Sequence, residues 1–278
     1  MAFQLDFGAT LADDIVGDAE DTCPVADVGS HRRIVIAFVG LAFEARIAEG
    51  PGVLVVCRTA GSELAKAADS AVRQGYRGMV SFGVAGGLAS HLRAGDWVVA
   101  SAVRESQTVR PTDVVWSRRL LGLIAGAVHA PVVGVDAPIA EPARKRELHR
   151  TTGAAAVDME SHIVARVAAA QGLAFAAVRV IVDPAHRKVP PAALLSMRPD
   201  GRADATAVLR DIVARPSQIS PLARIAVDAF IARAAMARVR RLLGPHFGFT
   251  DLDREVAHSD VAESELGGSD VAPYRSPA

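Results

Sequence analysis

The sequence predicts an α/β fold, in which strands alternate with helices, and three observations support this class. Half of the 278 residues are hydrophobic, so the chain can bury one large core. Short apolar runs alternate with segments in which apolar residues recur at helical spacing. The run 175–182 is almost entirely apolar, which is typical of a strand that is covered on both faces.

The predicted strands are the short apolar runs. The first covers residues 33–39 and ends at Gly40. The others cover 52–57, 78–82, 97–103 and 175–182, and a further apolar segment covers 127–135. After the strand 78–82 we expect the glycine-rich residues that follow to form a turn.

Three segments have the spacing of helices. Residues 63–75 carry an apolar face, and residues 159–171 form a helix that Gly172 closes. A longer helix starts at Ser220, carries an apolar stripe at three- and four-residue steps, and ends at Gly244.

The charged residues are unevenly distributed, although 31 basic and 31 acidic residues give a net charge of zero. Residues 1–30 hold seven acidic residues and no Lys or Arg, and residues 250–278 hold seven acidic residues and two arginines. Both segments read as acidic, flexible tails. The predicted domain, residues 31–249, therefore has a net charge of +12.

Composition excludes several classes of protein. Two cysteines, Cys23 and Cys57, are too few for a disulfide framework or a zinc cluster, so we expect no structural metal and a reducing, cytoplasmic compartment. No uncharged apolar run reaches about 18 residues, the length of a membrane-spanning helix. The first thirty residues lack the basic start and the apolar stretch of a signal peptide.

A glycine-rich segment, Ser-Phe-Gly-Val-Ala-Gly-Gly-Leu, covers residues 81–88. A strand that leads into glycines lets backbone amides approach a ligand closely, and a tight turn without a ligand explains the segment equally well. The spacing Gly-x-x-Gly-Gly matches neither the dinucleotide-binding fingerprint nor the phosphate loop.

Carboxylates occur at three places where an α/β fold can bind a ligand. Asp183 directly follows the buried strand 175–182, although an Asp in a turn before a proline is common. Asp158 and Glu160 flank Met159 at the start of a helix, where acidic residues also suit the helix dipole. Glu44 follows the first strand, at a position that a plain helix start also explains.

In this order, these segments resemble the superfamily of purine nucleoside phosphorylases and methylthioadenosine/adenosylhomocysteine nucleosidases. The resemblance covers roughly residues 33–185. The glycine-rich segment, together with residues 95–99, is similar to the turn and strand that form the family's purine site. Residues 157–160 are similar to the family's ribose-binding segment, and residues 182–183 are similar to its Ser-Asp pair. The resemblance implies a single three-layer α/β/α domain with a central mixed sheet.

The amino-acid sequences of four segments are most similar to those of the hopanoid-associated phosphorylases of bacteria. These segments are residues 40–48, 81–88, 156–162 and 179–184. This resemblance implies that the substrate is adenosylhopane, that the products are adenine and ribosyl- or phosphoribosylhopane, and that the reaction belongs to hopanoid biosynthesis.

The resemblance also implies roles for individual residues. Asp183 would donate a proton to N7 of adenine, Glu160 would accept hydrogen bonds from the ribose hydroxyls, and Met159 would pack against the sugar. The residues implied to bind the base are Val84, Ala85, Gly86, Ile139 and Asp158. The family's stacking phenylalanine is replaced by Pro138.

The nucleophile is left open by the sequence. Nucleosidases use a water that a glutamate activates, and Glu44 is the candidate here. Phosphorylases bind inorganic phosphate as a co-substrate, and the candidate residues are Gly40, Arg46 and Arg58. The name of the most similar family favours phosphorolysis, and no cofactor is implied.

Two alternatives remain at this stage. A nucleosidase acting on methylthioadenosine or adenosylhomocysteine would need a small closed pocket at the 5′ side of the ribose, whereas a hopane needs a wide apolar channel. A non-catalytic nucleoside-binding protein of the same fold is the other alternative, and the presence of Asp183 and Glu160 argues against it.

The basic domain and the lipid substrate together predict contact with the inner face of an anionic membrane. The basic residues that would make this contact are Arg118, Arg119, Arg144, Lys145, Arg146, Arg150, Arg238, Arg240 and Arg241. A solvated helix face explains each cluster as well. The family resemblance implies a homo-oligomer, and we expect no nucleic-acid partner.

Overall fold

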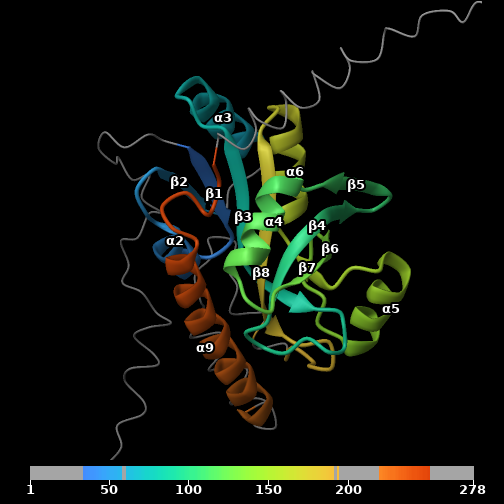
Figure 1. The fold of residues 1–278 in the computed structure, drawn as a ribbon. Helices are drawn as coiled ribbons and strands as arrows, with labels where there is room; N and C mark the ends of the chain where they lie inside the picture. Colours follow the sequence, from blue (N-terminus) through green and yellow to red (C-terminus); the bar gives the residue numbers. More distant parts are fainter. Residues whose placement is uncertain (1–33, 58–60, 191–192, 194–218, 251–278) are drawn as a thin grey trace, which may run out of the picture.

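The computed structural model describes residues 34–57, 61–190, 193 and 219–250 (Figure 1). The predicted tail at 1–30 lies outside the described residues, as does the tail at 250–278 apart from Thr250. Cys23 and Arg58 also lie outside them.

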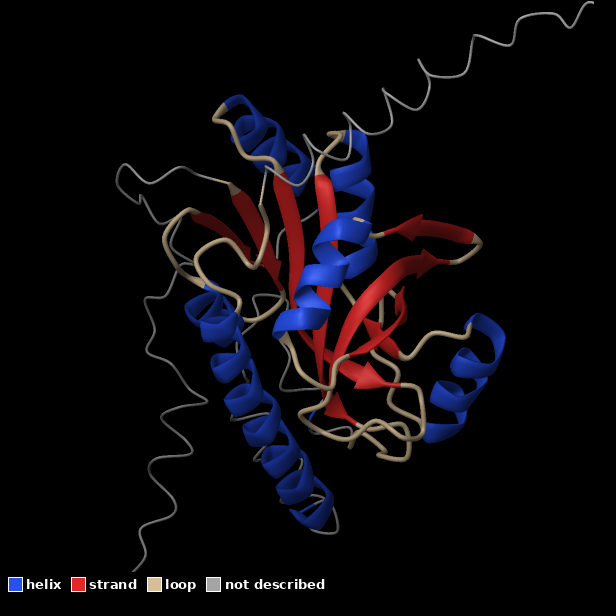
Figure 2. Cartoon of the chain, viewed as in Figure 1, coloured by secondary structure: helices blue, strands red, loops and turns tan. Residues whose placement is uncertain are grey.

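Eight strands of the described chain form one sheet (Figure 2). They are β1 (Val35–Val39), β2 (Val53–Cys57), β3 (Gly78–Gly87), β4 (Trp97–Glu105), β5 (Thr108–Pro111), β6 (Val128–Gly134), β7 (Ala156–Asp158) and β8 (Ala174–Asp183). The order is β2-β1-β3-β7-β6-β4-β5, and β8 pairs with both β3 and β4. β3 pairs with β1 and β8 in parallel and with β7 antiparallel, so the sheet is mixed, as predicted.

Six helices accompany the strands in the described residues. They are α2 (Ala42–Ala48), α3 (Gly61–Arg73), α4 (Val114–Leu123), α5 (Pro142–Thr152), α6 (Ser161–Ala170) and α9 (Ile219–Leu242). The predicted helices at 63–75, 159–171 and from Ser220 correspond to α3, α6 and α9, each with ends shifted by one or two residues. No element was predicted at β5, α4, α5 or β7, since short strands and weakly periodic helices carry little signal in a sequence.

Alternating side chains divide the core into two halves, one on each face of the sheet. In β1, Val35 and Ala37 pack with residues of α4 and α9, whereas Ile36 and Phe38 pack with residues of α3 and α6. Because successive residues of a strand point to opposite faces, this alternation means that helices cover both faces. The predicted three-layer α/β/α architecture is therefore confirmed.

The glycine-rich segment is where the structure differs most from the predicted secondary structure. Residues 83–87 were predicted to form a turn, but they continue strand β3, in which residues 83–86 pair with β8 and residues 86–87 pair with β7. The register shifts by one residue here, because Ala85 opposes Ile181 whereas Gly86 opposes Asp183. The glycines therefore serve close approach to neighbouring side chains rather than a change of chain direction.

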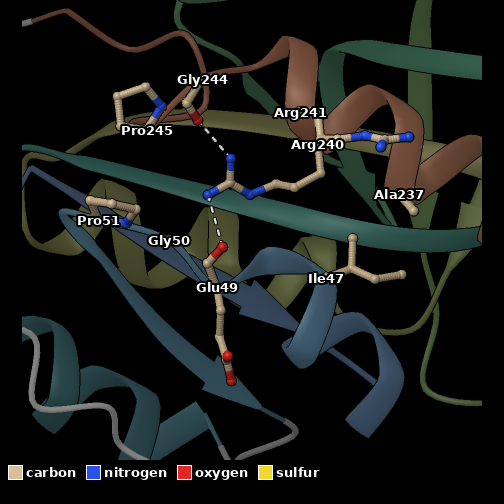
Figure 3. A pocket seen from close by; sticks show the side chains of 9 residues that line it. All are labelled: Ile47, Glu49, Gly50, Pro51, Ala237, Arg240, Arg241, Gly244 and Pro245. Carbon is tan, nitrogen blue, oxygen red and sulfur yellow. Dashed lines mark hydrogen bonds between the residues drawn. The ribbon is translucent and has the colours of Figure 1, made fainter.

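The end of α9 is tied to the end of α2 by Arg240. Its guanidinium donates hydrogen bonds to the carbonyl oxygens of Ala48 (3.0 Å), Glu49 (3.2 Å) and Gly244 (2.6 Å), as Figure 3 shows in part. An open cavity of about 630 Å³ lies at this junction. None of the site residues predicted from the sequence lines this cavity.

Candidate active site

Glu44 joins three segments of backbone through its buried carboxylate. Oε2 accepts hydrogen bonds from the backbone N–H groups of Gly40 (2.8 Å) and Leu41 (2.9 Å), at the turn between β1 and α2. Oε1 accepts a hydrogen bond from the N–H of Val84 in β3 (2.8 Å). The first two bonds cap α2, as a plain helix start would, but the third aims the carboxylate at the glycine-rich part of β3.

Arg179 lies beside Glu44, in a cluster that also contains Ser81, Asp158 and Glu160 and that we call the Glu44 cluster. No role was predicted for Arg179 from the sequence. The side chain is completely buried in β8, where its Nε lies 2.6 Å from Oδ2 of Asp158 and its Nη2 donates to Oγ of Ser81. Nη2 also lies 3.9 Å from Oε2 of Glu160. Nη1 makes no hydrogen bond to the described residues. A charged residue inside an otherwise apolar strand was the available signal, because such a residue must find a buried partner.

Two glycines allow these side chains to meet. A Cβ atom on Gly83 would lie 2.6 Å from Oε1 of Glu44 and 2.7 Å from Nη1 of Arg179. A Cβ atom on Gly40 would lie 2.6 Å from Oε1 of Glu160. A side chain at either glycine would force these groups to move. The predicted segments at residues 40–44, 81–88 and 157–160 therefore lie close together at one place.

Asp183 lies at the end of β8, opposite Gly86. A Cβ atom on Gly86 would lie 3.2 Å from Oδ1 of Asp183. The Asp183 carboxylate accepts a hydrogen bond from Nζ of Lys145, a completely buried residue of α5. Gly83 and Gly86 are three residues apart, about 10 Å along a strand. The Glu44 cluster and Asp183 therefore lie at two ends of one short stretch of β3.

Burial raises the pKa of both acids. Desolvation is the largest influence on the Glu44 carboxyl and raises its pKa above the ordinary value of 4.5. The hydrogen bond from the Val84 N–H and the positive charge of Arg179 lower this pKa, but by less. Desolvation likewise raises the pKa of Asp183 above 3.8, and Lys145 opposes this rise. Carboxyls with raised pKa are suited to proton transfer near neutral pH.

The predicted ribose-binding residues lie beside this cluster, in the turn between β7 and α6. Met159 and Glu160 are half-buried. Oδ1 of Asp158 accepts hydrogen bonds from the N–H of Glu160 (3.1 Å) and from the N–H and Oγ of Ser161. Since its Oδ2 faces Arg179, Asp158 holds the turn and the guanidinium in place. Base binding by Asp158 stays a prediction that these contacts do not favour.

The predicted base-binding residues lie near Asp183. Val84, Ala85 and Gly86 belong to β3, and Gly86 directly opposes Asp183. Ile139 is half-buried and packs against a small apolar cluster that includes Leu88 and Val157. A role in base binding remains a prediction for these four residues.

Of the three residues predicted to bind phosphate, only Gly40 lies beside Glu44 among the described residues. Gly40 lies in the cluster, but Arg46 is exposed and comes two residues after Glu44 in α2, which places it on the other side of the helix. Arg58 lies outside the described residues. The cation that the structure places beside Glu44 is Arg179.

Two of the basic residues predicted to contact a membrane are buried, and that part of the prediction is wrong. Lys145 is completely buried against Asp183, and Arg240 is 8% exposed and bound to carbonyl oxygens. Sequence proximity to Arg144, Arg146, Arg238 and Arg241 concealed the difference, because neighbours on a helix face different directions.

Comparisons with known proteins agree with this architecture. A family model described as the phosphorylase superfamily matches residues 15–214. Among solved structures, the 5′-methylthioadenosine/S-adenosylhomocysteine nucleosidase of Helicobacter pylori has a TM-score of 0.53 and 15% identity, covering 77% of this chain and 97% of that chain. The futalosine hydrolase of Helicobacter pylori has a TM-score of 0.51 and 16% identity, with the same coverage of 77% and 97%. No curated protein matches the chain.

The chain belongs to the phosphorylase superfamily, since the family model covers well over half of its length. It is an enzyme of the nucleoside phosphorylase and nucleosidase class, whose members act on the N-glycosidic bond of nucleosides.

Proposed function

We propose that the enzyme cleaves the N-glycosidic bond of an adenosyl substrate by attack of water, with Glu44 as the general base and Asp183 as the general acid. One observation carries this proposal. Two carboxyls with raised pKa lie at the two ends of the Gly83–Gly86 stretch, Glu44 beside Gly83 and Asp183 beside Gly86. In the proposed reaction the ribose side would be at Glu44 and the base side at Asp183. Departure of a purine needs a proton on the base and a nucleophile at the opposite side of the sugar.

The ribose would bind between these two groups. Glu160 would accept hydrogen bonds from the sugar hydroxyls, and these bonds strengthen as positive charge develops on the ring. Arg179 would fix this geometry, because its guanidinium faces both Asp158 and Glu160 from a completely buried position. Its Nη1, beside Glu44, would hold the oxygen of the nucleophile.

The charge of the cluster favours water over phosphate. Three carboxylates, those of Glu44, Asp158 and Glu160, surround the single guanidinium of Arg179. A phosphate dianion placed there would meet net negative charge, whereas a water molecule would meet a base and a hydrogen-bond donor. Hydrolysis, rather than the phosphorolysis that the sequence resemblance favours, is therefore our proposal.

An apolar 5′ substituent, and adenosylhopane in particular, is our proposed substrate. The N-terminal half of α9 extends past the end of the sheet at which β8 stops (Figure 1). This half exposes Val227 and Phe230, Ile231 follows directly, and Phe230 is 71% exposed. The same half is held near the site by Asp228, which pairs with Arg187 (2.7 Å), four residues after Asp183. An exposed apolar face at this position suits a polycyclic hydrocarbon better than a methylthio group.

Peripheral contact with an anionic membrane completes the proposal. The arginines Arg224, Arg233, Arg238 and Arg241 share α9 with the exposed apolar residues, and such a combination suits the surface of an anionic bilayer. In the part of the chain that the structure describes, no helix has the length and hydropathy to cross a membrane. The homo-oligomer and the cytoplasmic location stay predictions.

The test is to incubate the protein with adenosylhopane, with 5′-methylthioadenosine and with adenosine, each with and without phosphate. We expect adenine release from adenosylhopane at the highest kcat/KM, with a free ribosyl product whether or not phosphate is present. A phosphorylated sugar that forms only with phosphate would show phosphorolysis. Preference for methylthioadenosine would refute the lipid substrate. No adenine from any substrate, or equal release by Asp183→Asn, would refute the proposed reaction.

A further inference from the structure

Lys145 is the one lysine among the completely buried residues of the described chain, and it lies in the middle of a basic run. Its neighbours Arg144 and Arg146 are exposed, whereas no part of Lys145 reaches the surface. Lysine is almost never fully buried unless it is paired, because removing an ammonium group from water is costly. The position therefore requires a specific interaction.

The ammonium group of Lys145 is completely engaged at the end of β8. It pairs with Oδ2 of Asp183 and donates to the carbonyl oxygens of Asp183 (3.1 Å), Pro184 (3.2 Å) and Arg187 (3.2 Å). A single cation thus holds both the carboxyl of Asp183 and the backbone of the loop that follows it. Arg187 is itself fixed to Asp228 of α9.

A cation beside a carboxyl in a desolvated site changes the pKa of that carboxyl. Burial favours the neutral carboxylic acid of Asp183, and Lys145 is the strongest influence in the other direction. Without a cation, a desolvated carboxyl keeps its proton and is a weak acid. With Lys145 beside it, the carboxyl gives up its proton more easily, because the resulting anion is stabilised.

We propose that Lys145 is the positioning residue for the general acid Asp183: it orients the carboxyl toward the base and stabilises the carboxylate that forms when the proton moves to the leaving purine. This inference rests on the proposed function. In this step the proton moves from the Asp183 carboxyl to a ring nitrogen of the purine as the glycosidic C–N bond breaks. A water molecule, which gives a proton to Glu44, forms the new bond to the sugar carbon, and the Asp183 carboxylate remains paired with the ammonium of Lys145. Lys145 does not contact the substrate.

The experiment uses Lys145→Met, which keeps the length of the side chain, and Lys145→Gln, which keeps N–H donors for the loop carbonyls but has no charge. Adenine release from the adenosyl substrate that the wild type cleaves best is measured between pH 4 and 10. We expect kcat to fall by about 10²-fold in both variants, within the range of general acid catalysis. We also expect the alkaline limb of the kcat/KM profile to move to higher pH, because without the cation the Asp183 carboxyl stays protonated up to a higher pH.

A substrate that needs no acid separates this role from a structural one. Nitrophenyl riboside releases nitrophenolate without protonation, so we expect both variants to cleave it at the wild-type rate. Lys66→Met is the matched control, the same substitution at an exposed lysine of α3, and we expect it to change neither readout. Circular dichroism and the Tm confirm that each variant is folded.

The outcomes are distinct. A wild type that releases no adenine contradicts the proposed function and not the role of Lys145 alone. An active wild type with an unmoved alkaline limb in the folded variants would overturn the role of Lys145, as would an equal loss on both substrates. If neither variant folds, Lys145 is a structural anchor and the proposal is wrong.

Discussion

Glu44 and Asp183 are two buried carboxyls that we expect to act in opposite protonation states. Glu44 must be ionised to accept a proton from water, and Asp183 must be protonated to donate one to the base. Activity is then lost as the pH falls through the pKa of Glu44 and as it rises through the pKa of Asp183. Because burial raises both pKa values, we expect a bell-shaped profile of kcat/KM displaced to higher pH than ordinary carboxyls would give. Initial rates of adenine release across pH test this, and a profile flat down to pH 4 would exclude Glu44 as the base.

Substitution of Glu44 separates its catalytic role from its capping role. Glu44→Gln keeps an oxygen that can accept hydrogen bonds at the start of α2, but it cannot take a proton. We expect kcat to fall by about 10²- to 10⁴-fold while the Tm changes little. The matched control is Glu49→Gln, which is exposed at the other end of α2. Wild-type kcat in Glu44→Gln would show that Glu44 only caps the helix.

At the scale of single residues, the sequence predicted the acidic residues of the site, Asp183 and Glu44, but not the basic residues that pair with them. Asp183 and Glu44 were identifiable because each follows a buried strand, and strand ends are where α/β folds bind ligands. Arg179 and Lys145 were not, for different reasons. Arg179 was visible as a charge within an apolar strand, but its partners come from segments far away in the chain. Lys145 has no local signal, since only the direction of its side chain distinguishes it from Arg144 and Arg146.

Strand β3 shows, at the scale of the element, why a glycine-rich pattern can predict the wrong backbone conformation. Glycines predict a turn because they lack a side chain, and the same absence allows a strand to lie against buried side chains. Which of the two applies depends on neighbours in space. The close approach of Glu44 and Arg179 to Gly83 decides it here.

Gly83→Ala tests this account of β3. The new methyl group would lie 2.6 Å from Oε1 of Glu44 and 2.7 Å from Nη1 of Arg179, so both groups must move. We expect a loss of about 1–3 kcal/mol of unfolding free energy, typical of overpacking, and a larger proportional loss of kcat. Gly122→Ala in α4 is the control, because a Cβ atom there meets nothing within 4 Å. It should stabilise the protein by about 0.5–1 kcal/mol. Wild-type activity in Gly83→Ala would contradict the proposed geometry.

The junction of α2 and α9 depends on Arg240 in the same way. Arg240→Met removes the hydrogen bonds to Ala48, Glu49 and Gly244 and leaves their carbonyl oxygens without this donor. We expect a loss of about 2–3 kcal/mol of unfolding free energy, measured by urea denaturation. The exposed neighbour Arg241→Met should change stability by less than about 0.5 kcal/mol. Equal effects of the two variants would show that Arg240 is not a structural tie.

At the scale of the whole molecule, the distribution of charge matters more than its sum. The exposed arginines of α9 lie on the same helix as Val227, Phe230 and Ile231, so apolar insertion and attraction to anionic lipid can act together. We expect the protein to sediment with anionic vesicles at low salt and far less with neutral ones, and to be released as salt rises. Phe230→Ser should weaken this binding by about tenfold or more without lowering the Tm. Equal and negligible binding to both kinds of vesicle would refute membrane contact.

The acidic segments at the two ends of the chain oppose that attraction. Together, residues 1–30 and 250–278 contribute fourteen acidic residues and two arginines, so their removal raises the net charge of the protein by 12. If the basic domain binds anionic lipid electrostatically, a chain of residues 31–249 should bind anionic vesicles more tightly and with a steeper dependence on salt than the full chain. The loss of Phe230 should weaken both proteins by the same factor, because the apolar contribution does not depend on the ends. Unchanged binding after both deletions would mean that the end segments do not screen the basic domain, and that the zero net charge has no consequence for membrane contact.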